Sequence, residues 1–202
     1  MAELKHPHPQ SQSPVFAVIR VISAILCRVA PPLAVKWADR LFFTPVNRKR
    51  PQSELPAYKS AQKSFIDFKG LKVALFQWGH GDKTVILLHG WGSRGTRLGN
   101  LAPAFNERGY RVLAFDMIGH GDSDGKITNL AEMSELLATI YKDYGPVSAF
   151  VGHSFGGMVI SAAIHRFDLK VQRVAIVGSP FTLDHFFESF GEMINITPAI
   201  SE

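Results

Sequence analysis

A serine set between glycines is the residue of this chain best placed to do chemistry. Residues 152–157 read Gly-His-Ser-Phe-Gly-Gly and follow an apolar run that ends at Val151. This is the pattern of a nucleophile elbow, in which a strand turns sharply into a helix and a β-carbon at the flanking positions would collide with its neighbours. Ser154 is therefore predicted to present its hydroxyl at a helix N-terminus, where backbone N–H groups can stabilise an oxyanion.

Two further loops with polar residues follow two predicted strands upstream. Residues 84–88 read as a fully buried strand that runs into His-Gly-Trp-Gly at 89–92. Residues 111–115 form a second apolar run, and Asp-Met-Ile-Gly-His-Gly-Asp-Ser follows at 116–123. The interval 96–108 has helical length and spacing. Such alternation of strands and helices indicates a mostly parallel sheet that is covered on both faces.

These three motifs, in this order and spacing, resemble the α/β-hydrolase family, in the branch that uses a serine nucleophile. The resemblance covers residues 65–180. It implies that Ser154 is the nucleophile and that the backbone N–H groups of Trp91 and Phe155 form the oxyanion hole. It also implies structural roles at the site, without proton transfer, for His89, Gly90, Asp116, His120 and His153. We expect Asp116 to accept backbone hydrogen bonds in a tight turn.

The acid and the base of a catalytic triad stay unassigned. The family presents them after the serine, with the histidine in a loop after the last of eight strands. Residues 173–177 read as the sixth strand, and residues 181–202 as the opening of a helical cap. We therefore expect both partners beyond Glu202, in a longer hydrolase of which this chain is an amino-terminal fragment.

The histidines downstream of the serine are poor substitutes for the missing base. His165 falls inside the helix that follows the elbow. Asp184 and His185 are adjacent, and neighbouring side chains on a helix point about 100° apart. A triad requires a single imidazole that contacts both the serine and the acid. Asp184 and His185 are therefore not expected to act as the acid and the base.

The expected fold is α/β, with a mostly parallel sheet of the α/β-hydrolase type that is incomplete at the carboxyl end and carries an amino-terminal helical arm. We expect residues 1–60 to hold a disordered start, the arm and a linker, and residues 61–202 to hold strands one to six and the start of a cap. Residues 64–78 read as a hairpin with its turn at Lys69 and Gly70. Without a seventh strand, the sixth becomes an exposed edge, which is a route to aggregation.

Two other sites are suggested by short patterns. Residues 90–95 match the Gly-x-Gly-x-x-Gly dinucleotide fingerprint, with Asp116 after the next strand. That fingerprint needs a helix that starts within the glycines, and it leaves the elbow unexplained. Asp122 and Asp124 lack the further ligands and the closing glutamate of a calcium loop, so we interpret them as turn residues.

The first 50 residues carry the excess positive charge. They hold eight Lys or Arg and two acidic residues, a net charge of +6, whereas the rest of the chain has a net charge of −1. Seven apolar residues at helical spacing share one face: Val15, Val18, Ile19, Ile22, Ile25, Leu26 and Val29. Pro31 and Pro32 end this helix. The lone Cys27 excludes an internal disulfide, which suits a cytoplasmic location.

Two roles stay open for this basic arm. It is too short and too interrupted by arginine to span a bilayer, and it lacks the cleavage site of a signal peptide. Either its apolar face packs on the hydrolase body or the cap, or residues 15–50 make peripheral contact with an anionic membrane, with basic side chains against the headgroups.

The resemblance implies a serine hydrolase that cleaves a carboxylic ester or related acyl bond of a small-molecule substrate through an acyl-enzyme. It implies no cofactor, no metal and no nucleic-acid partner. Serine in the elbow argues against the dehalogenases and epoxide hydrolases of this scaffold, which place aspartate there. The alternative is a catalytically inactive, truncated remnant that acts as a binding or membrane-surface protein.

Overall fold

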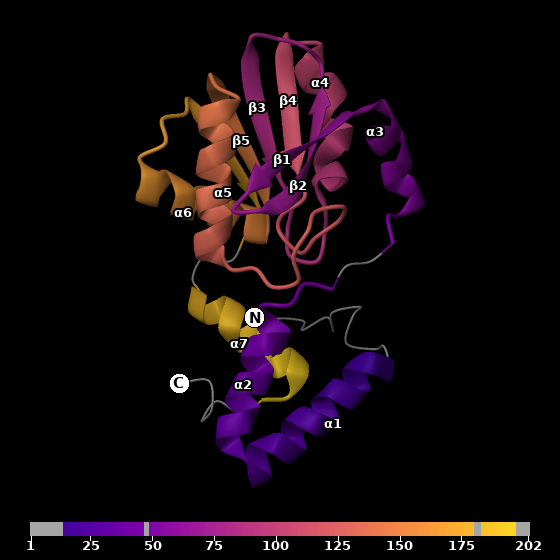
Figure 1. The fold of residues 1–202 in the computed structure, drawn as a ribbon, viewed down its shortest axis with the longest axis vertical. Coiled ribbons are helices and arrows are strands. Elements are labelled where there is room, and N and C mark those ends of the chain that lie inside the picture. Colours follow the sequence, from indigo (N-terminus) through magenta and orange to yellow (C-terminus); the bar gives the residue numbers. More distant parts are fainter. Residues whose placement is uncertain (1–13, 47–48, 180–182, 197–202) are drawn as a thin grey trace, which may run out of the picture. The chain divides into compact units, whose positions relative to one another are not determined.

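The computed structural model of the protein describes residues 14–46, 49–179 and 183–196 (Figure 1). The chain forms two compact units. The first, Met1–Phe42 with Phe181–Glu202, is called the helical unit, and the second, Phe43–Pro180, is called the sheet unit. Each unit is described by itself.

Six strands form one sheet in the sheet unit, in the order β1-β2-β4-β3-β5-β6. The first two pairings, β1 with β2 and β2 with β4, are antiparallel, and β3, β4, β5 and β6 run parallel. This confirms the predicted mostly parallel α/β sheet. The strands are β1 (Gln62–Phe68), β2 (Leu71–Trp78), β3 (Lys83–Leu88), β4 (Tyr110–Phe115), β5 (Val147–His153) and β6 (Arg173–Val177).

Helices cover both faces of this sheet. Figure 1 shows α5 (Leu130–Asp143) and α6 (Phe155–Phe167) on one side, and α3 (Leu55–Ser60) and α4 (Ala102–Asn106) on the other. A short 3-10 helix, η2 (Gln52–Glu54), precedes α3. Each central strand therefore buries both of its faces, as β3 does from Thr84 to Leu88.

Local sequence explains where several elements turn or start. Lys69 and Gly70 both have positive φ, 54° and 79°, as the predicted two-residue hairpin turn requires. Asn129 caps α5, and its side chain accepts a 2.9 Å hydrogen bond from the amide of Glu132.

The segment after β3 differs from its prediction as one helix over 96–108. A 3-10 helix, η3 (Gly95–Leu101), leads into the five-residue α4. A β-carbon at Gly99 would lie 2.7 Å from Cβ of Ala57, so the backbone here runs close to α3. Pro103 lacks an N–H and cannot continue the α-helical hydrogen bonds of the turn before it.

Strand β6 lies at the edge of the sheet, as predicted, and all five of its residues are exposed. Among the described residues, no strand pairs with its outer side. Val177, at its carboxyl end, is 59% exposed.

The helical unit contains α1 (Pro14–Val29), α2 (Pro31–Phe42) and α7 (Leu183–Ile194). The helix predicted over 15–29 and its end at the proline pair are confirmed, and α2 starts at that pair. The indole Nε1 of Trp37 donates a 3.1 Å hydrogen bond to Ser23 Oγ, which joins α2 to α1. No described helix has the length and apolar character needed to cross a bilayer.

Candidate active site

Ser154 occupies the turn between β5 and α6. Its φ of 52° and ψ of −123° are strained for a residue with a side chain, as a nucleophile elbow requires. Its amide donates a 2.9 Å hydrogen bond to the carbonyl of Val177, at the end of β6. The residue as a whole is half-buried.

Three glycines allow this turn. A β-carbon at Gly156 would lie 2.4 Å from the carbonyl oxygen of Leu88, and one at Gly152 would lie 2.8 Å from the amide nitrogen of Gly157. A β-carbon at Gly157 would lie 2.6 Å from the Ile176 side chain. At Gly152 and Gly156 a β-carbon would meet backbone atoms, which cannot move aside, so these two positions require glycine, as the sequence predicted.

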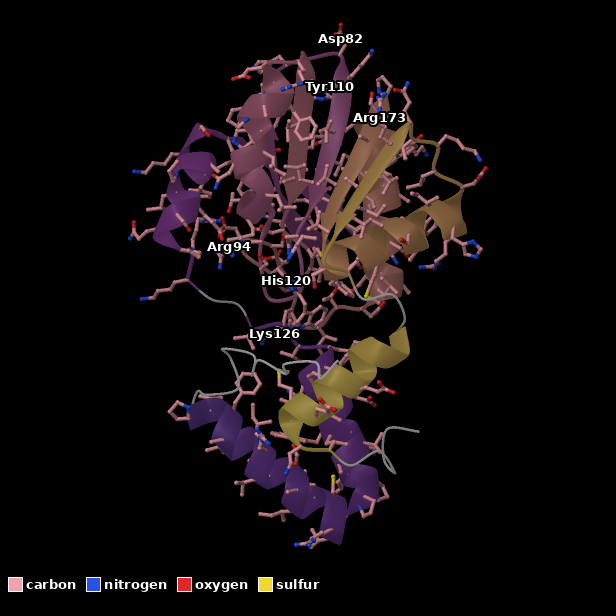
Figure 2. The ribbon with its side chains drawn as sticks, turned by 180° about the vertical axis from the view of Figure 1, so that it is seen from behind. Asp82, Arg94, Tyr110, His120, Lys126 and Arg173 are labelled. Atoms are coloured by element: carbon pink, nitrogen blue, oxygen red, sulfur yellow. The ribbon has the colours of Figure 1, made fainter. Side chains whose placement is uncertain are left out.

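The parallel strands bring the predicted site loops to one end of the sheet. Leu88 pairs with Gly152, so the loop after β3 begins beside the elbow. A β-carbon at Gly90 would lie only 3.0 Å from Cβ of Ser154. Figure 2 shows Arg94 and His120 at this carboxyl end of the strands, with Asp82, Tyr110 and Arg173 at the opposite end.

The two residues predicted to supply oxyanion-hole amides contact one another. The rings of Trp91 and Phe155 are edge-to-face, with centroids 5.1 Å apart. The Trp91 ring also packs edge-to-face on His120, at 5.3 Å. Trp91 therefore links the elbow to the loop after β4. Its amide and that of Phe155, the first residue of α6, belong to adjacent segments.

His89 is buried and bridges two loops as a neutral ring. Its Nδ1 lies 2.8 Å from the Gly90 carbonyl oxygen, and its Nε2 accepts a 3.0 Å hydrogen bond from the Met117 amide. The proton must therefore lie on Nδ1. Burial, followed by the nearby His120 ring, holds the pKa of His89 well below its ordinary value.

His120 also joins these two loops, but it belongs to the loop after β4 and accepts from the loop after β3. Its Nε2 accepts a 3.0 Å hydrogen bond from the Gly92 amide, and its Nδ1 lies 3.0 Å from the Ile118 carbonyl oxygen. Burial lowers the pKa of His120 to about 4. The neutral His120 ring thus holds Gly92, the residue that follows Trp91, in place. The sequence placed His120 in this loop but did not predict that it accepts from Gly92.

Asp116 accepts two backbone hydrogen bonds, as predicted. Its carboxylate binds the amide of Gly95 at 2.6 Å and the amide of Asp122 at 2.7 Å. Burial raises the pKa of Asp116 to about 6, and the two amide hydrogen bonds oppose that rise. The carboxylate is therefore ionised at neutral pH and holds two loops together.

A charged cluster around the buried Glu54, behind the loop after β3, was not predicted. Glu54 lies 3.7 Å from Arg97 and 4.0 Å from Arg94, and it accepts a 2.8 Å hydrogen bond from Thr96 Oγ1. The charge of Arg94 also contributes to the lowered pKa of His89 and of His120. Glu54 stands 40 residues before Arg94 in the chain, and no local pattern connects them.

The structure supplies no base for the serine within the described residues, where no side chain forms a hydrogen bond with Ser154 Oγ. His153 precedes the serine and is exposed, with Nδ1 close to Gly90. His165 lies on α6, 11 residues or about 16 Å of helix from Ser154. Asp184 and His185 belong to α7, and their side chains lie outside the described structure.

The dinucleotide and calcium patterns have structural explanations. The first α-helix after the glycines of 90–95 begins at Ala102, too late for a phosphate-binding turn. Asp122 pairs with Arg50 at 2.8 Å, and Asp124 accepts from the Lys72 amide at 2.9 Å. In the described part of the chain, no group of His, Cys, Asp or Glu is arranged to hold a metal ion.

Curated proteins with similar sequences include a transferase component and a hydrolase. The dihydrolipoyllysine-residue acetyltransferase component of the acetoin cleaving system of Cupriavidus necator is 34% identical over 140 residues, 67% of this chain and 35% of that protein. The 2-hydroxy-6-oxononadienedioate/2-hydroxy-6-oxononatrienedioate hydrolase of Escherichia coli K12 is 30% identical over 136 residues, 61% of this chain and 46% of that protein. The chain thus spans less than half the length of these relatives.

Solved structures share the fold. The thioesterase domain from the curacin biosynthetic pathway has a TM-score of 0.56 at 22% identity, with 67% of this chain and 54% of that chain covered. The epoxide hydrolase VrEH1 from Vigna radiata also has a TM-score of 0.56, at 21% identity over 66% of this chain and 47% of that one. The family model described as the alpha/beta hydrolase fold matches residues 83–196, more than half of the chain. The chain therefore belongs to the alpha/beta hydrolase fold family.

Proposed function

We propose that the chain carries the nucleophile and oxyanion-hole portion of a serine hydrolase that cleaves a carboxylic ester or related acyl bond. The observation that carries this proposal is the conformation of Ser154, with φ of 52° at the junction of β5 and α6. Strain of this kind persists where the surrounding fold enforces it, and it turns the hydroxyl toward an approaching substrate.

The proposed reaction proceeds through an acyl-enzyme. Ser154 Oγ attacks the acyl carbon, and the amides of Trp91 and Phe155 donate to the oxyanion that forms. Collapse of this intermediate expels the leaving group and leaves the acyl group on the serine. Water then releases the acid. A histidine outside the described residues would accept the serine proton and return it to the leaving group.

The names of the similar proteins support acyl chemistry. Thioesterase and acetyltransferase both denote transfer of an acyl group, and the Escherichia coli relative is named a hydrolase. The epoxide hydrolase VrEH1 matches in fold. Epoxide hydrolases and dehalogenases of this scaffold place aspartate in the elbow. The serine at this position in the present chain therefore favours acyl chemistry.

A second candidate is an inactive remnant that binds without catalysis. It is favoured by the lack of any hydrogen bond to Ser154 Oγ within the described residues. A serine without a base is a weak nucleophile at neutral pH. An oxyanion hole alone leaves an acceleration of about 10³ over water in a well-studied case.

An added base separates these two candidates. Hydrolysis of p-nitrophenyl butyrate by the purified chain is measured with increasing imidazole. Two variants are measured alongside it: Ser154→Ala and the helix variant Ser161→Ala, which loses a hydroxyl that donates to the Gly157 carbonyl. Once the rate with imidazole alone is subtracted, we expect an imidazole-dependent rate that Ser154→Ala lacks and Ser161→Ala keeps, because imidazole takes the serine proton. Mass spectrometry should then find the butyryl group on Ser154.

Equal rates for the chain and Ser154→Ala at every imidazole concentration would reject the hydrolase proposal in favour of the remnant. A serine-dependent rate without imidazole would show that a base is already present in the chain.

A further inference from the structure

Helix α1 presents two different apolar faces. One face carries Phe16, Ile19, Ser23 and Leu26, which are buried or half-buried, and it packs on α2 and α7 within the helical unit. The Trp37–Ser23 hydrogen bond lies on this face. The apolar face predicted from the sequence is therefore divided, since only part of it is used for packing.

The other face is apolar and exposed. Its residues recur every three or four positions, as one stripe of a helix does. Their exposed fractions run from 54% to 72%, and the stripe consists of Val15, Val18, Val21, Ile25 and Val29. We call these five residues the valine stripe.

Basic residues accompany the valine stripe. Arg20 and Arg28 on α1, and Lys36 and Arg40 on α2, are all exposed. Asp39 is the single acidic residue among positions 14–46. The helix that bears the stripe thus has two basic residues and no acidic residue, which favours a surface of anionic lipids.

We propose that the valine stripe lies on an anionic membrane surface, with α1 parallel to the bilayer plane. The stripe would enter the boundary between headgroups and acyl chains, while the arginines contact lipid phosphates. No described helix can cross a bilayer, so the contact is peripheral.

The area of the stripe favours lipid over a second copy of the chain. A helix of 16 residues is about 24 Å long, and one face about 10 Å wide therefore offers roughly 240 Å². A stable protein–protein contact needs about 800 Å² on each side. A lipid surface has no such minimum, because each apolar side chain that leaves water contributes separately.

Vesicle sedimentation tests the proposal. The full chain is mixed with vesicles of phosphatidylcholine alone or with phosphatidylserine, and the bound fraction is measured. We expect binding to the anionic vesicles that weakens strongly from about 0.1 M to about 1 M salt, as the Debye length falls from about 10 Å to about 3 Å. The triple variant Val18→Gln/Val21→Gln/Ile25→Gln should bind at least about tenfold more weakly, because it removes most of the apolar stripe.

A matched substitution controls for a general loss of apolar surface. Ile127 in the sheet unit is 55% exposed and Ile25 is 54% exposed, so Ile127→Gln changes a similar area elsewhere and should leave binding unchanged. Glutamine favours helix more than valine does, so helicity by circular dichroism should be kept in the triple variant. Failure of the chain to bind anionic vesicles, or equal binding by the triple variant, would overturn the proposal. So would a triple variant that mainly loses thermal stability or self-association, since the stripe would then be a protein contact.

Discussion

The two sides of the candidate site are held in different ways. On the side of β3 and β4, buried groups tie the loops together: His89 accepts from Met117, and His120 accepts from Gly92. On the side of β6, the amide of Ser154 is held by Val177, a residue 59% exposed at the sheet edge. The side that carries Trp91 is therefore shaped by internal contacts, whereas Ser154 depends on a strand that solvent reaches.

The largest effect is expected at Gly156, the glycine of the elbow that lies against the end of β3. Gly156→Ala should destabilise the sheet unit by about 4 kcal/mol, because its β-carbon would lie 2.4 Å from the Leu88 carbonyl oxygen. Gly70→Ala meets no atom within 4 Å and should cost about 1 kcal/mol, for its positive φ alone. Urea unfolding measures both. Equal losses would show that the elbow and β3 are not in contact.

Low pH should destabilise the side of the site that His89 and His120 hold together. His120 takes up a proton near pH 6.5 when unfolded and near pH 4 when folded. The folded state thus binds fewer protons between these values, so stability is fully present above pH 6.5 and falls as pH drops toward 4. The loss is about 3 kcal/mol for this residue.

His120→Gln isolates the pH-dependent contribution of His120. The glutamine side-chain amide can accept from Gly92 and donate to Ile118, but it does not titrate. Its free energy of unfolding, measured by urea from pH 7 to pH 4, should fall by about 3 kcal/mol less than that of the unchanged chain. Parallel pH profiles for the two proteins would contradict the buried, neutral His120.

Asp116→Asn should cost about 2 kcal/mol at pH 7. Asparagine offers one oxygen, whereas the carboxylate accepts from both Gly95 and Asp122, so one amide loses its partner. Asp67→Asn is the matched control, since Asp67 is exposed and accepts a single amide hydrogen bond from Gly70. Thermal unfolding that shows equal shifts for the two variants would reject a special role for Asp116.

The smallest expected change is at the edge strand. Val174→Lys should alter the free energy of unfolding by less than about 0.5 kcal/mol, because Val174 is 42% exposed, yet it should slow aggregation by placing a charge on the edge. Val85→Lys, at a position 1% exposed in β3, should prevent folding. Light scattering on heating compares them. Unchanged aggregation of Val174→Lys would show that β6 is not the exposed edge that associates.

The sequence predicted those parts of the site that depend on backbone geometry. In the elbow, glycine stands where a β-carbon does not fit, and in the Lys69–Gly70 turn φ is positive. Both requirements arise from the local backbone, so a short stretch of sequence reveals them. Asp116 was predicted as a backbone acceptor for the same reason.

Contacts between segments distant in the sequence were not predictable. The link from Glu54 to Arg97 and the hydrogen bond from Gly92 to His120 depend on packing of the whole sheet unit. On α1, helical spacing showed that the residues were apolar. It did not show that Ile19 would pack while Val18 stays exposed, because that depends on where α2 and α7 lie.

The hydrogen bond from Ser154 to Val177 gives the site a thermal sensitivity of its own. Strand ends at a sheet margin fray at lower free energy than the core opens. The Ser154 amide proton should therefore exchange with deuterium faster than amides of β3. On heating, the serine would lose its alignment before the sheet unfolds, so heat would inactivate such an enzyme below its melting temperature.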